Sequence, residues 1–144
     1  MKYYVDSCIY LNLWKREVGF DGTKYWELAK NFFNHLEKSR NIIYYSGFIL
    51  KELEYKFKDE PGKFIEKSVI FSEPIYNKIK ANESNYSCAR EFEQQFNYEI
   101  SFFDYMHITL AEKHSAALIT RDNDLLKTAK FLGVNAKRPE ELIH

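Results

Sequence analysis

Short β-prone runs alternate with longer helical patterns along most of the chain, and this order restricts the fold more than any other feature of the sequence. Three runs consist of apolar, aromatic or β-branched residues: Tyr3–Val5, Ile42–Tyr45 and Ala116–Ile119. We expect Val134–Ala136 to form one more strand. Segments with apolar residues at helical spacing separate these runs. Such alternation predicts an α/β layer fold with a mostly parallel sheet.

Several helices have a recognisable first or last residue. Asp6 or Ser7 can cap the helix that follows the first strand, and Ser46 can cap the helix that follows the second. Ser101 precedes a further helix, whose third position is an acid. Gly133 is placed to end the last long helix.

The segment from Asp59 to Asn97 is charged, helical in pattern and interrupted by Pro61 and Pro74. We expect two or three short helices here, including one around Cys88–Phe96. The paired phenylalanines Phe32–Phe33 and Phe102–Phe103 are interpreted as core residues.

Length and composition predict a single globular domain over residues 1–144, with 45% hydrophobic and 29% charged residues. The 11 Tyr and 12 Phe residues fit either a dense core or an adhesive interface. The formal charge of zero argues against a broad basic surface for nucleic acid, so such contact would have to be local. The two cysteines form no zinc-ligand pattern. No signal peptide or membrane-spanning run is recognisable, so a cytoplasmic protein is expected.

Acidic residues recur where the predicted strands end. Asp6 follows the first strand, Asp122 follows the third, and Glu52 lies in the helix that leaves the second. Ligands of parallel sheets gather outside the carboxyl ends of the strands, so these three acids are expected to converge. Asp104, in the first turn of its helix, faces the same edge only if the chain crosses over there.

Several ionised carboxylates in one pocket repel one another, by roughly 4 kcal/mol for a pair about 4 Å apart, unless a cation compensates. Oxygen ligands without cysteine favour Mg²⁺ or Mn²⁺ over zinc. Such an ion could activate a water and neutralise a phosphodiester. The hypothesis is therefore a metal site that attracts a polyanion to a chain without net positive charge.

Each acid also has a structural interpretation that the sequence leaves open. Asp6, Asp104 and Asp122 can all serve as helix-start residues, as can Asp124. Glu52 can pair with Lys56 four residues on.

The polar neighbours of these acids are open to similar alternatives. His107 shares a helix face with Asp104, and a half-buried histidine with satisfied hydrogen bonds is favoured over a ligand or proton carrier. Arg121 can meet either a phosphate or an acid. Small polar residues beside the acids could orient water around a metal: Ser7, Thr120 and Asn123.

Four segments in order resemble PIN-domain proteins, the metal-dependent ribonucleases that include VapC-type toxins. They are YYVDSCIYLNL, SGFILKELE, SFFDYMHITLAEKHSAALITRDNDLL and GVNAKRPEELI. The resemblance implies a three-layer fold, with a mostly parallel five-stranded sheet flanked by helices. It also implies a catalytic, metal-binding set of acids at Asp6, Glu52, Asp104 and Asp122, with Asp124 as an auxiliary ligand.

The activity implied by the resemblance is hydrolysis of RNA phosphodiesters by a Mg²⁺- or Mn²⁺-activated water, which leaves a 5′-phosphate. An antitoxin partner and a homodimer are implied for a toxin of a toxin–antitoxin pair. Two alternatives keep the fold: a housekeeping RNA-processing nuclease, and a non-catalytic PIN-like module that binds RNA or protein. A phosphate-handling receiver or phosphatase is disfavoured, because no Asp-x-Asp-x-Thr follows the first strand.

Overall fold

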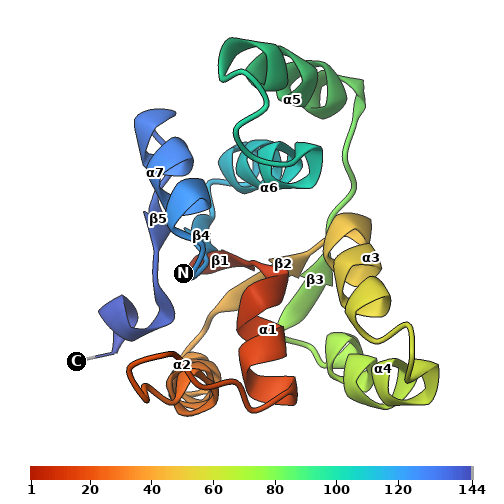
Figure 1. Cartoon of the computed structure of the whole chain (residues 1–144), viewed down its shortest axis with the longest axis vertical. Coiled ribbons are helices and arrows are strands. Elements are labelled where there is room, and N and C mark those ends of the chain that lie inside the picture. Colours follow the sequence, from red (N-terminus) through yellow and green to blue (C-terminus); the bar gives the residue numbers. More distant parts are fainter. Residues whose placement is uncertain (144) are drawn as a thin grey trace.

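The computed structural model describes residues 1–143 and contains a parallel sheet with helices on both faces (Figure 1). The strands lie in the order β3-β2-β1-β4-β5. They span β1 Lys2–Val5, β2 Ile42–Tyr45, β3 Tyr76–Lys78, β4 Ala117–Ile119 and β5 Ala136–Lys137. Within the described residues, no helix is both long and apolar enough to cross a membrane.

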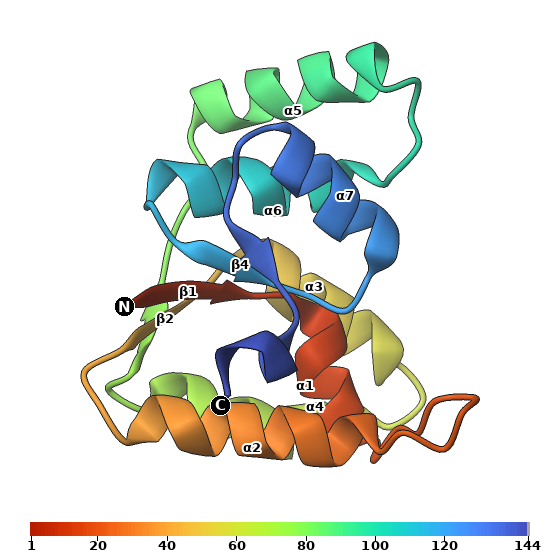
Figure 2. The ribbon, with the colours of Figure 1, turned by 90° about the vertical axis from the view of Figure 1, so that its left-hand side faces the viewer.

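The helices form the two outer layers of a three-layer structure. They span α1 Ser7–Trp14, α2 Tyr25–Glu37, α3 Gly47–Lys56, α4 Pro61–Ser68, α5 Glu83–Gln95, α6 Phe102–Lys113 and α7 Asn123–Phe131. Two 3₁₀ helices, η1 Val69–Ser72 and η2 Pro139–Leu142, complete the chain. Figures 1 and 2 show α1, α2 and α4 on one face of the sheet, and α5, α6 and α7 on the other.

β1 lies at the centre of the sheet, paired with β2 on one side and β4 on the other. Tyr4 and Val5 are completely buried, as is Leu118 on β4, because both faces of the sheet are covered by helices. After β1 the chain adds β2 and β3 on one side, and then crosses to add β4 and β5 on the other. The crevice for a ligand in such sheets lies at this reversal, beside the carboxyl ends of β1 and β4.

The predicted α/β fold and its five parallel strands are confirmed. The local sequence pattern did not predict the position of one strand, β3. β3 lies within the segment 59–97, where only helices were expected. That expectation was wrong for Tyr76–Lys78, although α4 and α5 are present. β3 is a three-residue edge strand with exposed Asn77 and Lys78, so it lacks the apolar run that identifies a buried strand.

The aromatic residues serve mainly the core, although not all of them lie where the sequence indicated. Tyr10 is completely buried and contacts the rings of Trp14, Phe33 and Phe71. Phe32 is also completely buried. Phe33 and Phe102 are half-buried and pack against the buried core, so their interpretation as core residues holds in part. Phe103 is half-buried in the first turn of α6, where its ring contacts Phe48, and is not among the residues packed on the core, so its interpretation as a core residue was wrong.

Candidate functional site

Asp6 lies at the carboxyl end of β1 and is the N-cap of α1, which decides between Asp6 and Ser7 as the capping residue. Its Oδ1 accepts a hydrogen bond from the backbone N–H of Ser7 at 2.8 Å. Its Oδ2 accepts one from the Thr120 hydroxyl at 2.7 Å and a longer one from the Cys8 thiol at 3.3 Å. Asp6 as a whole is 5% exposed, so the ends of β1 and β4 together hold its carboxylate in a buried position.

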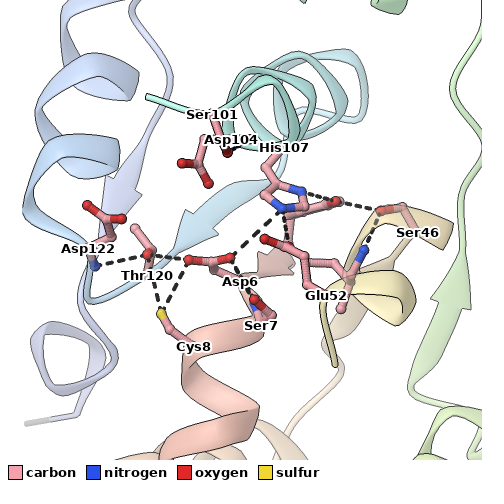
Figure 3. A network of polar contacts seen from close by, with 12 residues as sticks. Asp6, Ser7, Cys8, Ser46, Glu52, Ser101, Asp104, His107, Thr120 and Asp122 are labelled. Carbon is pink, nitrogen blue, oxygen red and sulfur yellow. Dashed lines mark hydrogen bonds and ion pairs between the residues drawn. The ribbon is translucent and has the colours of Figure 1, made fainter. Parts of the chain in front are cut away.

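Glu52 reaches the same place from α3 by pairing with His107 on α6. The Glu52 Oε1 lies 2.7 Å from the His107 Nε2. The other ring nitrogen, Nδ1, lies 2.7 Å from the Tyr4 hydroxyl, which is itself 2.7 Å from the Ser46 hydroxyl. This buried chain of contacts, drawn in Figure 3, fixes the imidazole orientation and aims Glu52 toward Asp6.

Asp6, Glu52 and His107 thus form one cluster, with a ligand-type atom of each within 4.8 Å of the others. Asp104 extends from α6, one turn before His107, with its carboxylate on the Asp6 side of the helix (Figure 3). Asp122 lies on the side of Thr120 that is away from Asp6 (Figure 3). Its Oδ1 caps α7 by accepting the N–H groups of Asp124 and Leu125.

Burial makes two of these carboxylates costly to ionise. It raises the pKa of Asp6, to which the charge of Glu52 adds, while His107 and the Thr120 hydrogen bond act in the opposite direction. It also raises the pKa of Asp104 to about 6, again with an offset from His107. A cation bound between such buried, neighbouring carboxylates would stabilise their ionised forms.

His107 supplies part of that positive charge. Burial lowers the pKa of His107, but the hydrogen bond to Glu52 and the charges of Glu52, Asp6 and Asp104 outweigh burial, so the pKa is raised. Both ring nitrogens already have partners, which leaves the imidazole without a free lone pair for a metal unless the Glu52 contact is given up. We therefore interpret His107 as the residue that orients Glu52.

The donor set fits a hard divalent cation. The Oδ1 of Asp6 accepts one short hydrogen bond, from the Ser7 N–H, and retains a lone pair for a cation, whereas Oδ2 already accepts from Thr120 and Cys8. Glu52 and Asp104 add further carboxylate oxygens beside it. Oxygen donors of this kind suit Mg²⁺ or Mn²⁺. The Cys8 thiol has a pKa raised well above its usual value, first by burial and then by the charge of Asp6, so it stays protonated and is a poor ligand.

The acids line an open cleft of about 840 Å³ at the carboxyl edge of the sheet. Asp6, Glu52, Asp104 and Asp122 all contribute to its wall, whereas Asp124 is exposed and lies outside the lining residues. Arg121 also lines the cleft, but its guanidinium is paired with both carboxylate oxygens of Glu140, at 2.8 and 2.9 Å. Of the two roles left open for Arg121, the structure therefore has the pairing with an acid.

The structure also tests the expected partners of Glu52, His107 and the small polar residues beside the acids. Glu52 pairs with His107 instead of with Lys56. His107 has satisfied hydrogen bonds as expected, but it is completely buried, so the expectation of a half-buried residue was wrong. Ser7 and Thr120 both contact Asp6, whereas the Asn123 side chain meets Arg138.

Solved structures of toxin–antitoxin proteins share this fold at low sequence identity. VapBC2 from Rickettsia felis, bound to a promoter DNA fragment, is 19% identical over 96% of this chain and 98% of that chain, with a TM-score of 0.71. VapC20 from Mycobacterium tuberculosis, described as a Sarcin-Ricin loop cleaving toxin, is 15% identical over 88% and 94%, with a TM-score of 0.69. VapBC-1 from nontypeable Haemophilus influenzae is 15% identical over 97% and 99%, with a TM-score of 0.68.

The family assignment rests on the sequence itself. No curated protein matches the chain. The family model described as PIN domain matches residues 3–131, from β1 to the end of α7. The matched range contains the whole acidic cluster together with Asp104 and Asp122. The chain belongs to the PIN domain family.

Proposed function

We propose that this protein is a Mg²⁺- or Mn²⁺-dependent endoribonuclease. The observation that supports the proposal best is the convergence of Asp6 and Glu52 in a cleft that Asp104 and Asp122 also line, with buried His107 behind Glu52. Buried carboxylates with raised pKa values in a cleft are typical of a functional site. VapC20, which has the same fold, is described as a Sarcin-Ricin loop cleaving toxin.

A bound divalent cation would supply a nucleophilic water and neutralise charge on the phosphodiester. Asp6 would hold the cation from a fixed position, because Ser7 and Thr120 restrain its two oxygens. Glu52 is presented by His107, and Asp104 closes the site from the start of α6. Asp122 borders the cleft, where its free oxygen can orient water by accepting a hydrogen bond.

Cleavage of labelled single-stranded RNA with Mg²⁺, Mn²⁺ or EDTA tests the activity. We expect cleavage only with metal, products with a 5′-phosphate, and a loss of about 100-fold or more in Asp6→Asn and Asp104→Asn. Asp59→Asn is the matched control, because it makes the same change at an exposed residue outside the cleft and should retain near-normal activity. Equal activity in EDTA would refute the proposal.

Calorimetry with Mn²⁺ isolates the metal site from the reaction. Binding should weaken strongly in Asp6→Asn and should be retained in the control Asp59→Asn. Absence of any Mg²⁺ or Mn²⁺ binding by the wild-type protein would leave the acids as structural residues and would support the non-catalytic module instead.

We also propose that the nuclease acts as a toxin with a protein antitoxin, and that it forms a homodimer. Several proteins with this fold were solved as VapBC or toxin–antitoxin complexes, which supports an antitoxin partner. Expression should arrest growth, and co-expression of a small reading frame found beside the gene should relieve the arrest. Normal growth during expression of active nuclease would favour the housekeeping role. Light scattering measures the oligomeric state, and a monomer would contradict the proposed homodimer.

A further inference from the structure

A fully exposed phenylalanine lies beside the acidic cleft. Phe20 belongs to the turn between α1 and α2, and its side chain has no protection from solvent. It nevertheless lines the same cleft as Asp6, Glu52 and Asp104. Figure 2 shows this turn projecting beyond the body of the molecule. An isolated exposed apolar residue is ordinary, but an aromatic ring at the mouth of a polar site provides a surface for a ligand.

The turn that holds Phe20 has a defined backbone. Val18 and Lys24 form an antiparallel bridge on either side of it. The Gly19 N–H donates to the Thr23 carbonyl at 2.8 Å, and the Gly22 N–H donates to the Gly19 carbonyl at 3.0 Å. Gly22 has a φ of 85°, in the left-handed region that favours glycine. The ring of Phe20 is therefore presented by a hydrogen-bonded turn.

A row of side chains supports this turn from behind. Gly19 packs so closely on Tyr25 that a Cβ at this position would lie 2.8 Å from the Tyr25 hydroxyl. The Tyr25 ring in turn lies 4.4 Å from the Arg121 guanidinium, which Glu140 holds by two hydrogen bonds. Tyr25 thereby connects the turn to Arg121, the residue that precedes Asp122.

Two lysines occupy the cleft wall near this turn. The Lys15 ammonium donates to the Lys56 carbonyl at 3.0 Å and lies 5.0 Å from the centre of the Phe57 ring. Lys56 is exposed and lines the cleft as well. They provide local positive charge on a chain whose formal net charge is zero. A phosphate backbone can lie on these ammonium groups while its bases turn outward.

We propose that Phe20 is a stacking platform for one unpaired base of a single-stranded RNA, with Lys15 and Lys56 contacting the adjoining phosphates. The inference rests on the proposed ribonuclease function and narrows its substrate to strands with free base faces. Aromatic rings beside cationic groups are the usual means of holding single strands with little sequence preference. Bases inside a duplex are already stacked on both faces and cannot use the ring.

Binding can be measured without cleavage in the Asp104→Asn background with Mg²⁺ present. The probe is a fluorescein-labelled, non-self-complementary RNA of about 12 nucleotides, followed by fluorescence anisotropy. Phe20→Ala should weaken binding by about 5- to 150-fold, the range expected for one lost stacking contact, and Phe20→Trp should preserve binding. Phe131→Ala, which removes an exposed phenylalanine of α7 outside the cleft, is the matched control and should change nothing.

An abasic scan of the same RNA identifies stacking directly. Removing one particular base should weaken binding to the protein that retains Phe20, and should have no effect on binding to the Phe20→Ala variant. The proposal would be overturned if the protein with Phe20 and the Phe20→Ala variant bound the intact RNA equally well. It would also be overturned if every abasic position weakened binding to the two proteins by the same factor, because the base and the ring would then act independently. Unchanged RNA binding together with lost affinity for a co-expressed protein partner would also overturn it. Failure of wild-type protein to cleave RNA is a separate result, because this assay reads binding alone.

Discussion

Replacing Asp104 with Asn should stabilise the metal-free protein near neutral pH, although it removes a residue of the proposed metal site. Burial raises the pKa of Asp104 to about 6, and the charges of Asp6 and Glu52 add to the effect, partly offset by His107. The folded protein therefore holds this proton more tightly than the unfolded chain. Stability from this group is present below the unfolded pKa and is lost as pH rises through the folded pKa.

The size of the effect follows from that pKa. An Asp in an unfolded chain titrates near 3.9, so the difference is about two pKa units, and at about 1.4 kcal/mol per unit the upper limit is about 3 kcal/mol. Asp104 also lies in the first turn of α6, where the helix dipole favours a carboxylate by about 0.3–1 kcal/mol. A net gain of about 2 kcal/mol in Asp104→Asn corresponds to about 4–8 °C for a chain of this size.

Thermal unfolding in EDTA, from about pH 5 to about pH 8, measures this gain. The wild-type Tm should fall as pH rises, and the Asp104→Asn Tm should fall less, so that the two separate most at the alkaline end. Added Mn²⁺ should raise the wild-type Tm far more than that of the variant. Asp59→Asn, which changes an exposed acid outside the helices and the cleft, should follow the wild type throughout. A lower Tm for Asp104→Asn than for wild type in EDTA at the alkaline end would refute the reasoning.

Three further substitutions test the supports of the site. His107→Gln should cost about 2 kcal/mol or more, because it disturbs the buried contacts to Glu52 and Tyr4, and should weaken Mn²⁺ binding about 10- to 100-fold by calorimetry. Tyr4→Phe removes one buried hydroxyl and should cost about 1–2 kcal/mol in urea unfolding while the far-ultraviolet spectrum stays unchanged. Arg121→Lys should also lower stability, by about 1 kcal/mol, since a lysine cannot make the paired contact with Glu140.

The sequence predicted those parts of the fold that have a strong local pattern. β1, β2 and β4 are short apolar or aromatic runs because helices cover both faces of the sheet, and each was recognised with bounds that differ by at most one residue. β3 has no such pattern. It pairs only with β2 and exposes two of its three side chains, so its existence depends on an open sheet edge instead of on its own residues. The family resemblance, and not the local pattern, indicated a fifth strand.

The role of His107 depends on contacts that no local pattern encodes. Residues 105–111 of α6 are all buried, so helical periodicity does not distinguish one of its faces. The partners of the imidazole come from elsewhere, Tyr4 being 103 residues away and Glu52 55 residues away. One signal was present in the sequence: His107 follows Asp104 by three residues, which places both on one side of the helix. That spacing indicated shared position but not the pairing with Glu52.

The position of Asp104, which the strand-end rule alone left open, follows from the short link between α6 and β4. Only His114–Ala116 separate them, so the end of α6 must lie at the amino edge of the parallel sheet, where β4 begins. A helix of 12 residues is about 18 Å long, which is ample to return its first turn to the carboxyl edge of a short strand. Asp104 therefore arrives beside the end of β1 because of chain geometry. Ser101 then fixes the helix start at that edge by accepting the Asp104 N–H at 3.1 Å.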